Sequence, residues 1–203
     1  MLYISKEGYV YTDKIKMKIF ATIERGKMDR VNGIVVHQTD SSTAESTFNS
    51  YKNKGANGAH FLIDKDGTIY QTASLYQVTN HVGKMQSRCY KTHECAPTEF
   101  KRMSALEKAW KPSQISEIER KKKFPDRYPF NTDAIGIEIV GKSRPDPGQK
   151  EKITYDQVNE AQNASLKWLV RELSQALSVS MTEIYRHSDV ARKTEAEAST
   201  ARW

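Results

Sequence analysis

The sequence predicts a single α/β domain that carries one insertion. Short β-prone runs alternate with segments of helical periodicity along most of the 203 residues, and this alternation is typical of α/β proteins. Between residues 84 and 131 the alternation gives way to a stretch rich in lysine, arginine and proline. We therefore expect a leader over residues 1–32 that packs on a main domain over residues 33–203, with a helical and loop insertion over residues 84–131.

The composition, 37% hydrophobic and 28% charged, is that of an ordinary globular protein. A domain of this length buries roughly 70% of its unfolded surface, which is enough for a core. No run of 18 or more apolar residues is present, so a membrane-spanning helix is excluded. The first eight residues lack a basic segment followed by an apolar stretch, and we therefore expect no secretory signal peptide. The protein is expected to work in the cytosol or to leave it by another route.

The net charge of +7 favours a polyanionic partner, either a nucleic acid or a bacterial wall polymer. The densest cationic run, Arg120–Lys123, contains no aromatic residues of the kind that stack on bases. Such a run is more typical of a solvated helix face. We therefore expect no nucleic-acid partner.

The first half of the main domain shows one strand, one helix and one hairpin. The run over residues 33–37 is typical of a buried strand. Ser42 is followed three residues later by glutamate, which is the spacing of a capping box, so we expect a helix over residues 43–53. Two β-prone runs, residues 59–63 and residues 68–71, flank a turn that ends in glycine and predict a hairpin.

The second half alternates in the same way after the insertion. A second capping-box spacing, in residues 154–157, precedes an amphipathic stripe that continues to Leu177 and predicts a long helix. The elements expected here are helices over residues 98–109 and 113–123 within the insertion, a strand over residues 134–140, a loop over residues 143–153, the long helix, and a short strand over residues 183–186.

Within the insertion, Cys89 and Cys95 are six residues apart, which permits a local disulfide or two free thiols.

Two histidines stand at matching places in this pattern. His37 and His187 each end a hydrophobic strand where the chain enters a polar loop, and strand ends facing a cleft are where α/β proteins mount their sites. Catalytic zinc takes three protein ligands and keeps a fourth position open. A carboxylate of the segment after His187, either Glu195 or Glu197, completes that count. Without such partners the segment would be more typical of a solvated polar turn.

Two further residues suit hydrolysis of an amide or ester. Glu138 lies within an isoleucine-rich strand, on the face opposite the isoleucines, and is the best candidate for a base that accepts a proton from water. Lys193 lies between the histidine and the carboxylates and offers a compact positive charge for an oxyanion.

Together these residues match the motifs of a known family. The matching blocks, in chain order, are Val35–Thr39, Gly58–Gln71, His81–Gly83, Ala134–Glu138 and the segment that starts at His187. They resemble the zinc-dependent N-acetylmuramoyl-L-alanine amidases, the group that also contains phage lysozyme-amidases and peptidoglycan recognition proteins. The resemblance runs from about residue 32 to residue 203. It implies a mixed central β-sheet flanked by helices and hydrolysis of the amide between N-acetylmuramic acid and the L-alanine of the stem peptide.

The resemblance also implies roles for individual residues. His37 and His187 are implied as zinc ligands, Glu138 as the base and Lys193 as the group that stabilises the transition state. His60 and His81 resemble residues that contact substrate in the cleft.

The third ligand is the point at which this sequence departs from the family pattern. The family usually has an aspartate or cysteine two residues after the lysine, where this chain has Glu195. The ending that starts at Glu197 resembles a subgroup with its glutamate at that later place. We therefore expect Glu197 as the third ligand, with Glu195 as its rival.

The insertion, with its two cysteines, resembles that of amidases carried by bacterial type VI secretion systems. This implies an antibacterial effector that is made without a signal peptide, is delivered to the periplasm of a target cell, and has a cognate immunity protein and a secretion-system spike component as partners. An oxidising periplasm would allow a bridge between Cys89 and Cys95. The alternatives are a cytosolic wall-recycling amidase, a phage endolysin or a non-catalytic peptidoglycan-binding module.

Overall fold

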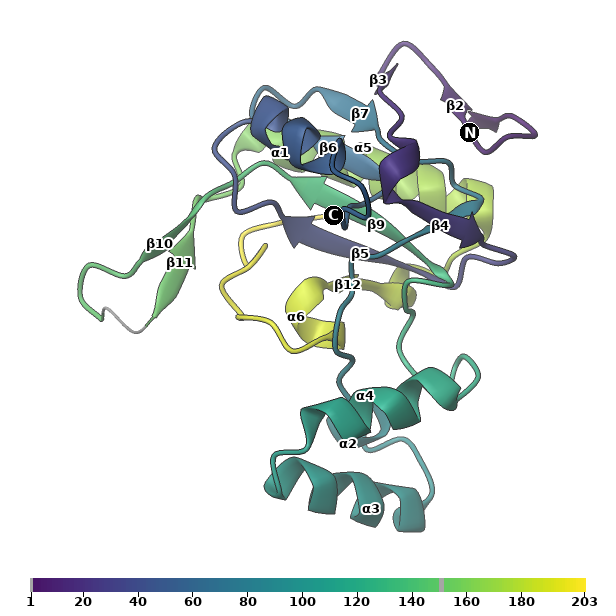
Figure 1. Ribbon diagram of the computed structural model, residues 1–203, viewed down its shortest axis with the longest axis vertical. Coiled ribbons are helices and arrows are strands. Elements are labelled where there is room, and N and C mark those ends of the chain that lie inside the picture. The colour runs from purple at the N-terminus through teal and green to yellow at the C-terminus, as the bar shows by residue number, and fades with distance from the viewer. Residues whose placement is uncertain (1, 150–151) are drawn as a thin grey trace.

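The computed structural model describes residues 2–149 and 152–203 and contains one mixed six-stranded sheet with helices on both faces (Figure 1). The strand order across the sheet is β12–β5–β9–β6–β7–β3. These strands are β3 (Ile15–Met17), β5 (Gly33–Gln38), β6 (Phe61–Ile63), β7 (Ile69–Gln71), β9 (Ala134–Ile139) and β12 (Ile184–Arg186). Only the β6–β7 pair is antiparallel among the described strands of this sheet. The predicted single α/β domain is confirmed.

The remaining strands form three separate antiparallel pairs. They are β1 (Tyr3–Ile4) with β2 (Val10–Tyr11), β4 (Glu24–Lys27) with β8 (Gln77–Thr79), and β10 (Ser143–Pro145) with β11 (Ile153–Tyr155). The helices are α1 (Ala44–Tyr51), α2 (Arg88–Thr92), α3 (Pro97–Lys108), α4 (Pro112–Lys121), α5 (Glu160–Leu177) and α6 (His187–Val190), with short 3-10 turns at Ala21–Ile23 and Met181–Glu183. None of the described helices has the length and apolar character needed to cross a membrane.

The two faces of the central sheet differ in chemistry because side chains alternate along each strand. On one face the isoleucines of β9 pack against α5 in the main hydrophobic core. That core includes Ile34, Val36, Ile135, Ile137 and Ile139 from the strands and Leu166, Leu169, Val170 and Leu173 from α5. His37 follows Val36 on β5, and Glu138 lies between Ile137 and Ile139 on β9, so both side chains face the other way. They are register partners in the parallel β5–β9 pair, so their side chains emerge side by side.

The leader contributes to the sheet itself. Its strand β3 pairs in parallel with β7 and forms one edge of the six-stranded sheet. The buried Gln71 side chain on β7 donates to the Gly8 carbonyl (2.8 Å) and accepts from the Val10 amide (2.8 Å). These bonds attach the first strands of the chain to the main domain.

The insertion folds as a small helical unit with a core of its own. Helices α2, α3 and α4 enclose the buried residues Cys89, Met103 and Ile115, and they lie to one side of the sheet, below it in the view of Figure 1. Cys89 and Cys95 form a disulfide with their Cα atoms 5.4 Å apart. The two expected helices are present as α3 and α4, whereas α2 was not predicted.

Three local predictions are wrong. The N-cap of α1 is Thr43, not Ser42, because Thr43 has the extended backbone that precedes the helix and its hydroxyl accepts from the Ser46 amide (3.2 Å). Helix α5 begins later than the spacing in residues 154–157 indicates, because Asn159 and Gln162 form the reciprocal capping box instead.

The third error concerns residues 143–153. They were expected to be a loop, but the ends of this segment belong to the β10–β11 hairpin. The hairpin projects from the domain beside the C-terminal ends of β5 and β9 (Figure 1), and it therefore reaches the region of the candidate site.

Candidate metal centre and its cleft

A cleft of about 920 Å³ opens on the polar face of the sheet. Residues from separate parts of the chain line it. They include His37, His187 and Glu197, which are expected to bind metal, and Glu138 and Lys193, which are expected to take part in catalysis. The fold therefore brings together groups that are up to 160 residues apart in the sequence.

Three buried side chains converge in this cleft and could hold a metal ion. His37, His187 and Glu197 each offer one ligand atom, and these atoms lie within 4.8 Å of one another. Glu197 Oε1 is 2.9 Å from His187 Nδ1 and 3.6 Å from His37 Nδ1. Two imidazoles and one carboxylate are the donor set of many three-ligand zinc sites.

The electrostatics of the cluster favour a charged Glu197 carboxylate beside a neutral His37 ring. Burial alone would raise the pKa of Glu197, but its hydrogen bonds with His187 and His37 hold that pKa well below the usual value. Burial, and then the charge of His187, lowers the pKa of His37 to about 4. An ionised carboxylate and a neutral imidazole are the protonation states in which these side chains bind metals.

Backbone geometry delivers the two histidines. His37 is near the end of β5, and His187 follows directly on β12, which runs parallel to β5 at the edge of the sheet. The C-terminal segment then returns across the end of β5, where the Ala198 amide donates to Gln38 Oε1 (2.9 Å). This bond places the adjacent Glu197 beside the rings.

Glu195, the rival third ligand, is exposed and is not part of the cluster. It is two residues before Glu197 in a segment of turns, and its side chain therefore does not share the buried position. The structure brings Glu197, and not Glu195, to the two histidines.

Glu138 stands beside His37 with an unpaired oxygen. Its Oε2 atom is buried and has no hydrogen-bond partner among the described residues. Burial, and then the negative charge of Glu197, raises the pKa of Glu138 to about 8, while the charge of Lys193 opposes this shift. A carboxyl that titrates near neutral pH is suited to accept and return a proton.

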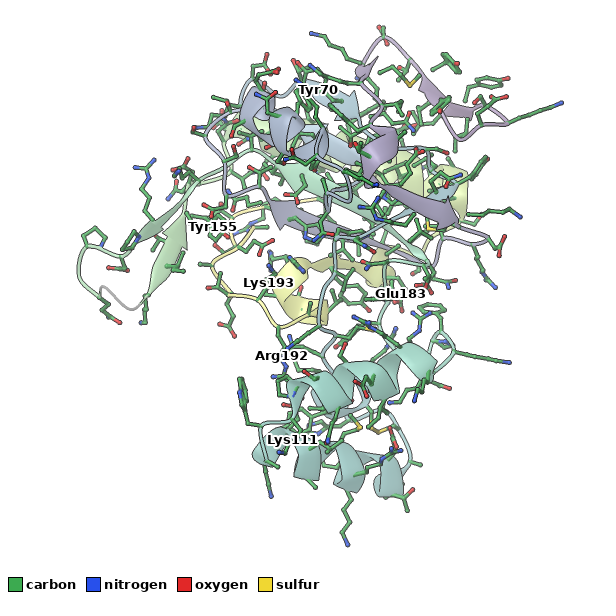
Figure 2. All side chains as sticks on the ribbon, in the orientation of Figure 1. Tyr70, Lys111, Tyr155, Glu183, Arg192 and Lys193 are labelled. Atoms are coloured by element: carbon green, nitrogen blue, oxygen red, sulfur yellow. A yellow bond between two sulfur atoms is a disulfide. The ribbon has the colours of Figure 1, made fainter. Side chains whose placement is uncertain are left out.

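Lys193 lies on the exposed loop after α6 and lines the same cleft, next to Arg192 and the insertion (Figure 2). Its charge acts on both His37 and Glu138, since it lowers the pKa of the first and opposes the rise in the second. It is therefore placed to stabilise negative charge that develops in the cleft.

The two other predicted histidines have different positions. His81 lines the cleft as expected, and its Nδ1 lies 3.0 Å from Nε2 of His37. His60 is fully buried, where its Nε2 contacts the Gln77 carbonyl (2.9 Å) and its Nδ1 accepts from the Gly136 amide (3.0 Å). Both ring nitrogens of His60 are therefore engaged below the cleft, and His60, unlike His81, is not among the residues that line it.

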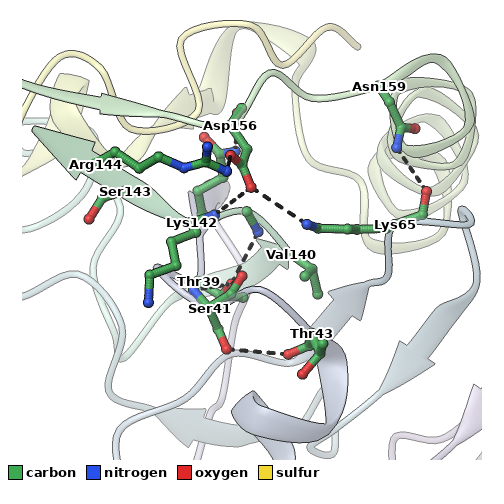
Figure 3. A network of polar contacts seen from close by, with 12 residues as sticks. Thr39, Ser41, Thr43, Lys65, Val140, Lys142, Ser143, Arg144, Asp156 and Asn159 are labelled. Atoms are coloured by element: carbon green, nitrogen blue, oxygen red, sulfur yellow. Dashed lines mark hydrogen bonds and ion pairs between the residues drawn. The ribbon is translucent and has the colours of Figure 1, made fainter. Parts of the chain in front are cut away.

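Tyr155, on the hairpin strand β11, is a cleft residue that the sequence did not single out. Burial, and then the charge of Glu197, raises its pKa to about 12, so its hydroxyl remains a hydrogen-bond donor. The next residue, Asp156, anchors the hairpin (Figure 3): its carboxylate accepts from the Lys142 amide (3.1 Å) and from Arg144 (2.7 Å), and it pairs with Lys65 (3.5 Å). The β-branched and aromatic run over residues 153–155 is the only sequence signal for this strand.

Comparison with known proteins gives the family of the chain and agrees with its fold. Residues 27–199 match the family described as N-acetylmuramoyl-L-alanine amidase. The chain therefore belongs to this family, whose members are enzymes that hydrolyse an amide bond of peptidoglycan. No curated protein sequence is similar enough to this chain to count as a relative.

Solved structures resemble the whole domain. AmpDh3 from Pseudomonas aeruginosa is 19% identical, with 98% of this chain and 63% of that chain covered and a TM-score of 0.54. A selenomethionine derivative of AmpD is 15% identical, with 95% and 92% covered and a TM-score of 0.53. PlyL is 14% identical, with 90% and 85% covered and a TM-score of 0.53. At these identities the likeness establishes the shared fold.

Proposed function

We propose that this amidase is zinc-dependent and that it cleaves the bond between the lactyl group of N-acetylmuramic acid and the L-alanine of the stem peptide. The observation that carries the proposal is the convergence of His37, His187 and Glu197, whose ligand atoms lie within 4.8 Å of one another. The donor set fits zinc, and the unpaired Glu138 oxygen beside it is a buried polar atom that lacks a partner among the described residues.

His37, His187 and Glu197 would hold the ion, and zinc bound there supplies Lewis-acid activation of a carbonyl and of water. Glu138 accepts the proton of the attacking water and returns it to the departing nitrogen, because a pKa of about 8 permits both transfers near neutral pH. Lys193 stabilises the negative charge on the carbonyl oxygen. The carbon–nitrogen bond breaks, which leaves a carboxylate on the sugar and a free amino group on L-alanine.

Digestion of purified peptidoglycan tests this reaction. The expected products are stem peptides with a free L-alanine amino terminus and uncut glycan strands, both detected by mass spectrometry. Removal of zinc by a chelator is expected to abolish product formation, and re-addition is expected to restore it. Cleavage within the glycan or within the peptide would contradict the proposed bond. Wall binding without any product would instead favour a non-catalytic peptidoglycan-binding module.

We further propose that the amidase is an antibacterial effector delivered to the periplasm of a rival cell by a type VI secretion system, with an immunity protein and a spike component as partners. The Cys89–Cys95 disulfide supports this destination, because such bonds persist in oxidising compartments.

Expression with and without a periplasmic export signal tests the destination. Toxicity is expected only after export, and the exported Glu138→Gln variant is expected to be harmless. Killing of a neighbouring strain should also require an intact secretion sheath in the producing cell. Absence of toxicity in the periplasm would favour a cytosolic wall-recycling amidase, and toxicity without any need for the secretion system would favour a phage endolysin.

A further inference from the structure

One short segment, His81–Val82, contacts both histidines of the candidate metal centre. His81 Nδ1 lies 3.0 Å from His37 Nε2, and the Val82 carbonyl oxygen lies 2.8 Å from His187 Nε2. Both contacts are made by Nε2 of the histidine ring, whereas Nδ1 of each ring lies near Glu197. Each ring is therefore engaged at one nitrogen by the segment and presents the other to the cluster.

The contacts of the segment determine where the ring protons lie. A backbone carbonyl can only accept a hydrogen bond, so His187 carries a proton on Nε2, which it donates to Val82. For the same reason His81 carries its proton on Nε2, which lies 3.2 Å from the Ala134 carbonyl oxygen. In a neutral ring, Nδ1 of His81 is then an acceptor, and His37 must donate to it from Nε2. His37 therefore keeps its Nε2 proton for His81, and Nδ1, which faces Glu197, is the nitrogen left to bind a metal ion.

The structure also fixes the segment in place. The Asn131 side-chain oxygen accepts from both backbone amides, that of His81 (3.0 Å) and that of Val82 (2.8 Å). Gly136 on β9 leaves the room that the imidazole of His81 occupies, because a Cβ atom there would lie only 2.9 Å from Cγ of His81. Both the backbone and the ring of this segment are therefore held by neighbours that bind neither His37 nor His187.

We propose that His81–Val82, held by Asn131, is the positioning element of the metal centre and that His81 selects the tautomer of His37 that can bind zinc through Nδ1. The inference rests on the proposed zinc site and deepens it. It assigns His81 a role toward the metal ligands in addition to its place in the cleft wall. Hydrogen bonds of this kind to a ligand imidazole typically affect metal affinity by 10- to 100-fold.

Zinc affinity, measured by competition with a chelator and without substrate, tests the proposal. His81→Phe keeps a ring but removes the acceptor, and its dissociation constant for zinc should rise roughly 10- to 100-fold. His81→Asn, whose side-chain oxygen can replace Nδ1 as the acceptor, should recover part of that loss. His93→Phe, at an exposed histidine after α2, is the matched control and should bind zinc as the wild type does.

Variants of Asn131 test the same inference if His81→Phe fails to fold. Asn131→Ala removes the anchor of the segment and should also weaken zinc binding, whereas Asn131→Asp retains an acceptor oxygen and should weaken it less. In the zinc-loaded protein with labelled histidine, nuclear magnetic resonance should find the His37 proton on Nε2. Wild-type zinc affinity in folded His81→Phe and Asn131→Ala, or a His37 proton on Nδ1, would overturn the inference. Failure of the wild-type protein to bind zinc would overturn the proposed function instead.

Discussion

The cleft takes its residues from two regions that are built differently. His37 and Glu138 stand on adjacent central strands of a sheet whose core is continuous with α5. The insertion, α2 to α4, has a separate small core around a disulfide. The first region therefore presents its groups from a rigid frame. The second meets the site through side-chain and backbone contacts with the loop that carries Lys193.

Arg192 makes several of those contacts. Its backbone amide donates to the Lys84 carbonyl (2.9 Å), and its guanidinium forms an ion pair with Glu107 and lies 5.4 Å from the ring centre of Trp110. The insertion therefore fixes the residue next to Lys193, whereas the sheet fixes Glu138, the proposed proton acceptor, and His37, one of the proposed metal ligands. The difference indicates that damage to the sheet site should abolish catalysis, and that damage to the insertion should reduce it.

The largest effect is expected in the sheet region. Glu138→Gln removes the proton acceptor and should lower kcat about 10²- to 10⁴-fold, with zinc content and the unfolding transition retained. Product release from purified peptidoglycan, assayed together with bound zinc, measures both. Activity close to that of the wild type would remove Glu138 from the mechanism.

The second effect is on folding stability at acidic pH, which should depend on the sheet region and not on the insertion. Burial lowers the pKa of His60, which lies in the sheet frame, to about 4, whereas the unfolded value is about 6.5. As the pH falls, His60 is therefore protonated in the unfolded state before it is protonated in the folded state. The folding free energy that a neutral His60 preserves above pH 6.5 is lost between pH 6.5 and pH 4. The loss amounts to about 3 kcal/mol at 1.36 kcal/mol per unit.

Urea denaturation across this pH range measures that loss. His60→Gln retains a donor for the Gln77 carbonyl and should make the profile less steep. His37 and His81, whose pKa values burial also lowers, account for the slope that remains. His93→Gln in the insertion should not change the profile. An equally steep profile in His60→Gln would place the acid sensitivity elsewhere.

The disulfide should have a smaller and more local effect. Loss of the bridge in the Cys89→Ser, Cys95→Ser double variant should cost about 2 kcal/mol for a loop this short. The independent core of the insertion should confine the loss to α2, α3 and α4. Hydrogen exchange should therefore accelerate in residues 88–121 and remain slow in β5 and β9. Equal acceleration in those central strands would show that the two regions unfold together.

The smallest effect is expected at the contact between the regions. Arg192→Ala should shift the loop that carries Lys193 and lower kcat roughly 10-fold, with zinc affinity unchanged because no metal ligand is contacted. Lys101→Ala, an exposed change on α3, is the control. A loss of zinc from Arg192→Ala would mean that the helices α2 to α4 also support the metal cluster.

Sequence patterns predicted the sheet region better than the insertion and the hairpin. His37 and Glu138 could be found because each interrupts a hydrophobic strand, and a buried polar residue in such a run requires a partner or a function. The hairpin with Tyr155 was missed because its strands are three residues long and are separated by a proline- and glycine-rich segment. The difference between His60 and His81 could not be predicted, since it depends on which atoms of distant strands reach the two rings.

The identity of the third ligand depends on the same kind of information. Glu195 and Glu197 stand at similar distances from Lys193 in sequence, and only the folded position of the C-terminal segment separates them. In the structure, the contact between Ala198 and Gln38 brings Glu197 inward and leaves Glu195 exposed.

Zinc stoichiometry in the Glu195→Ala and Glu197→Ala variants is therefore the most direct measurement of the proposed centre. The wild-type protein and Glu195→Ala should each hold one equivalent of zinc after dialysis, and both should release stem peptide from peptidoglycan. Glu197→Ala should hold little or none and should be inactive. Retention of zinc by Glu197→Ala together with its loss from Glu195→Ala would contradict the centre formed by His37, His187 and Glu197.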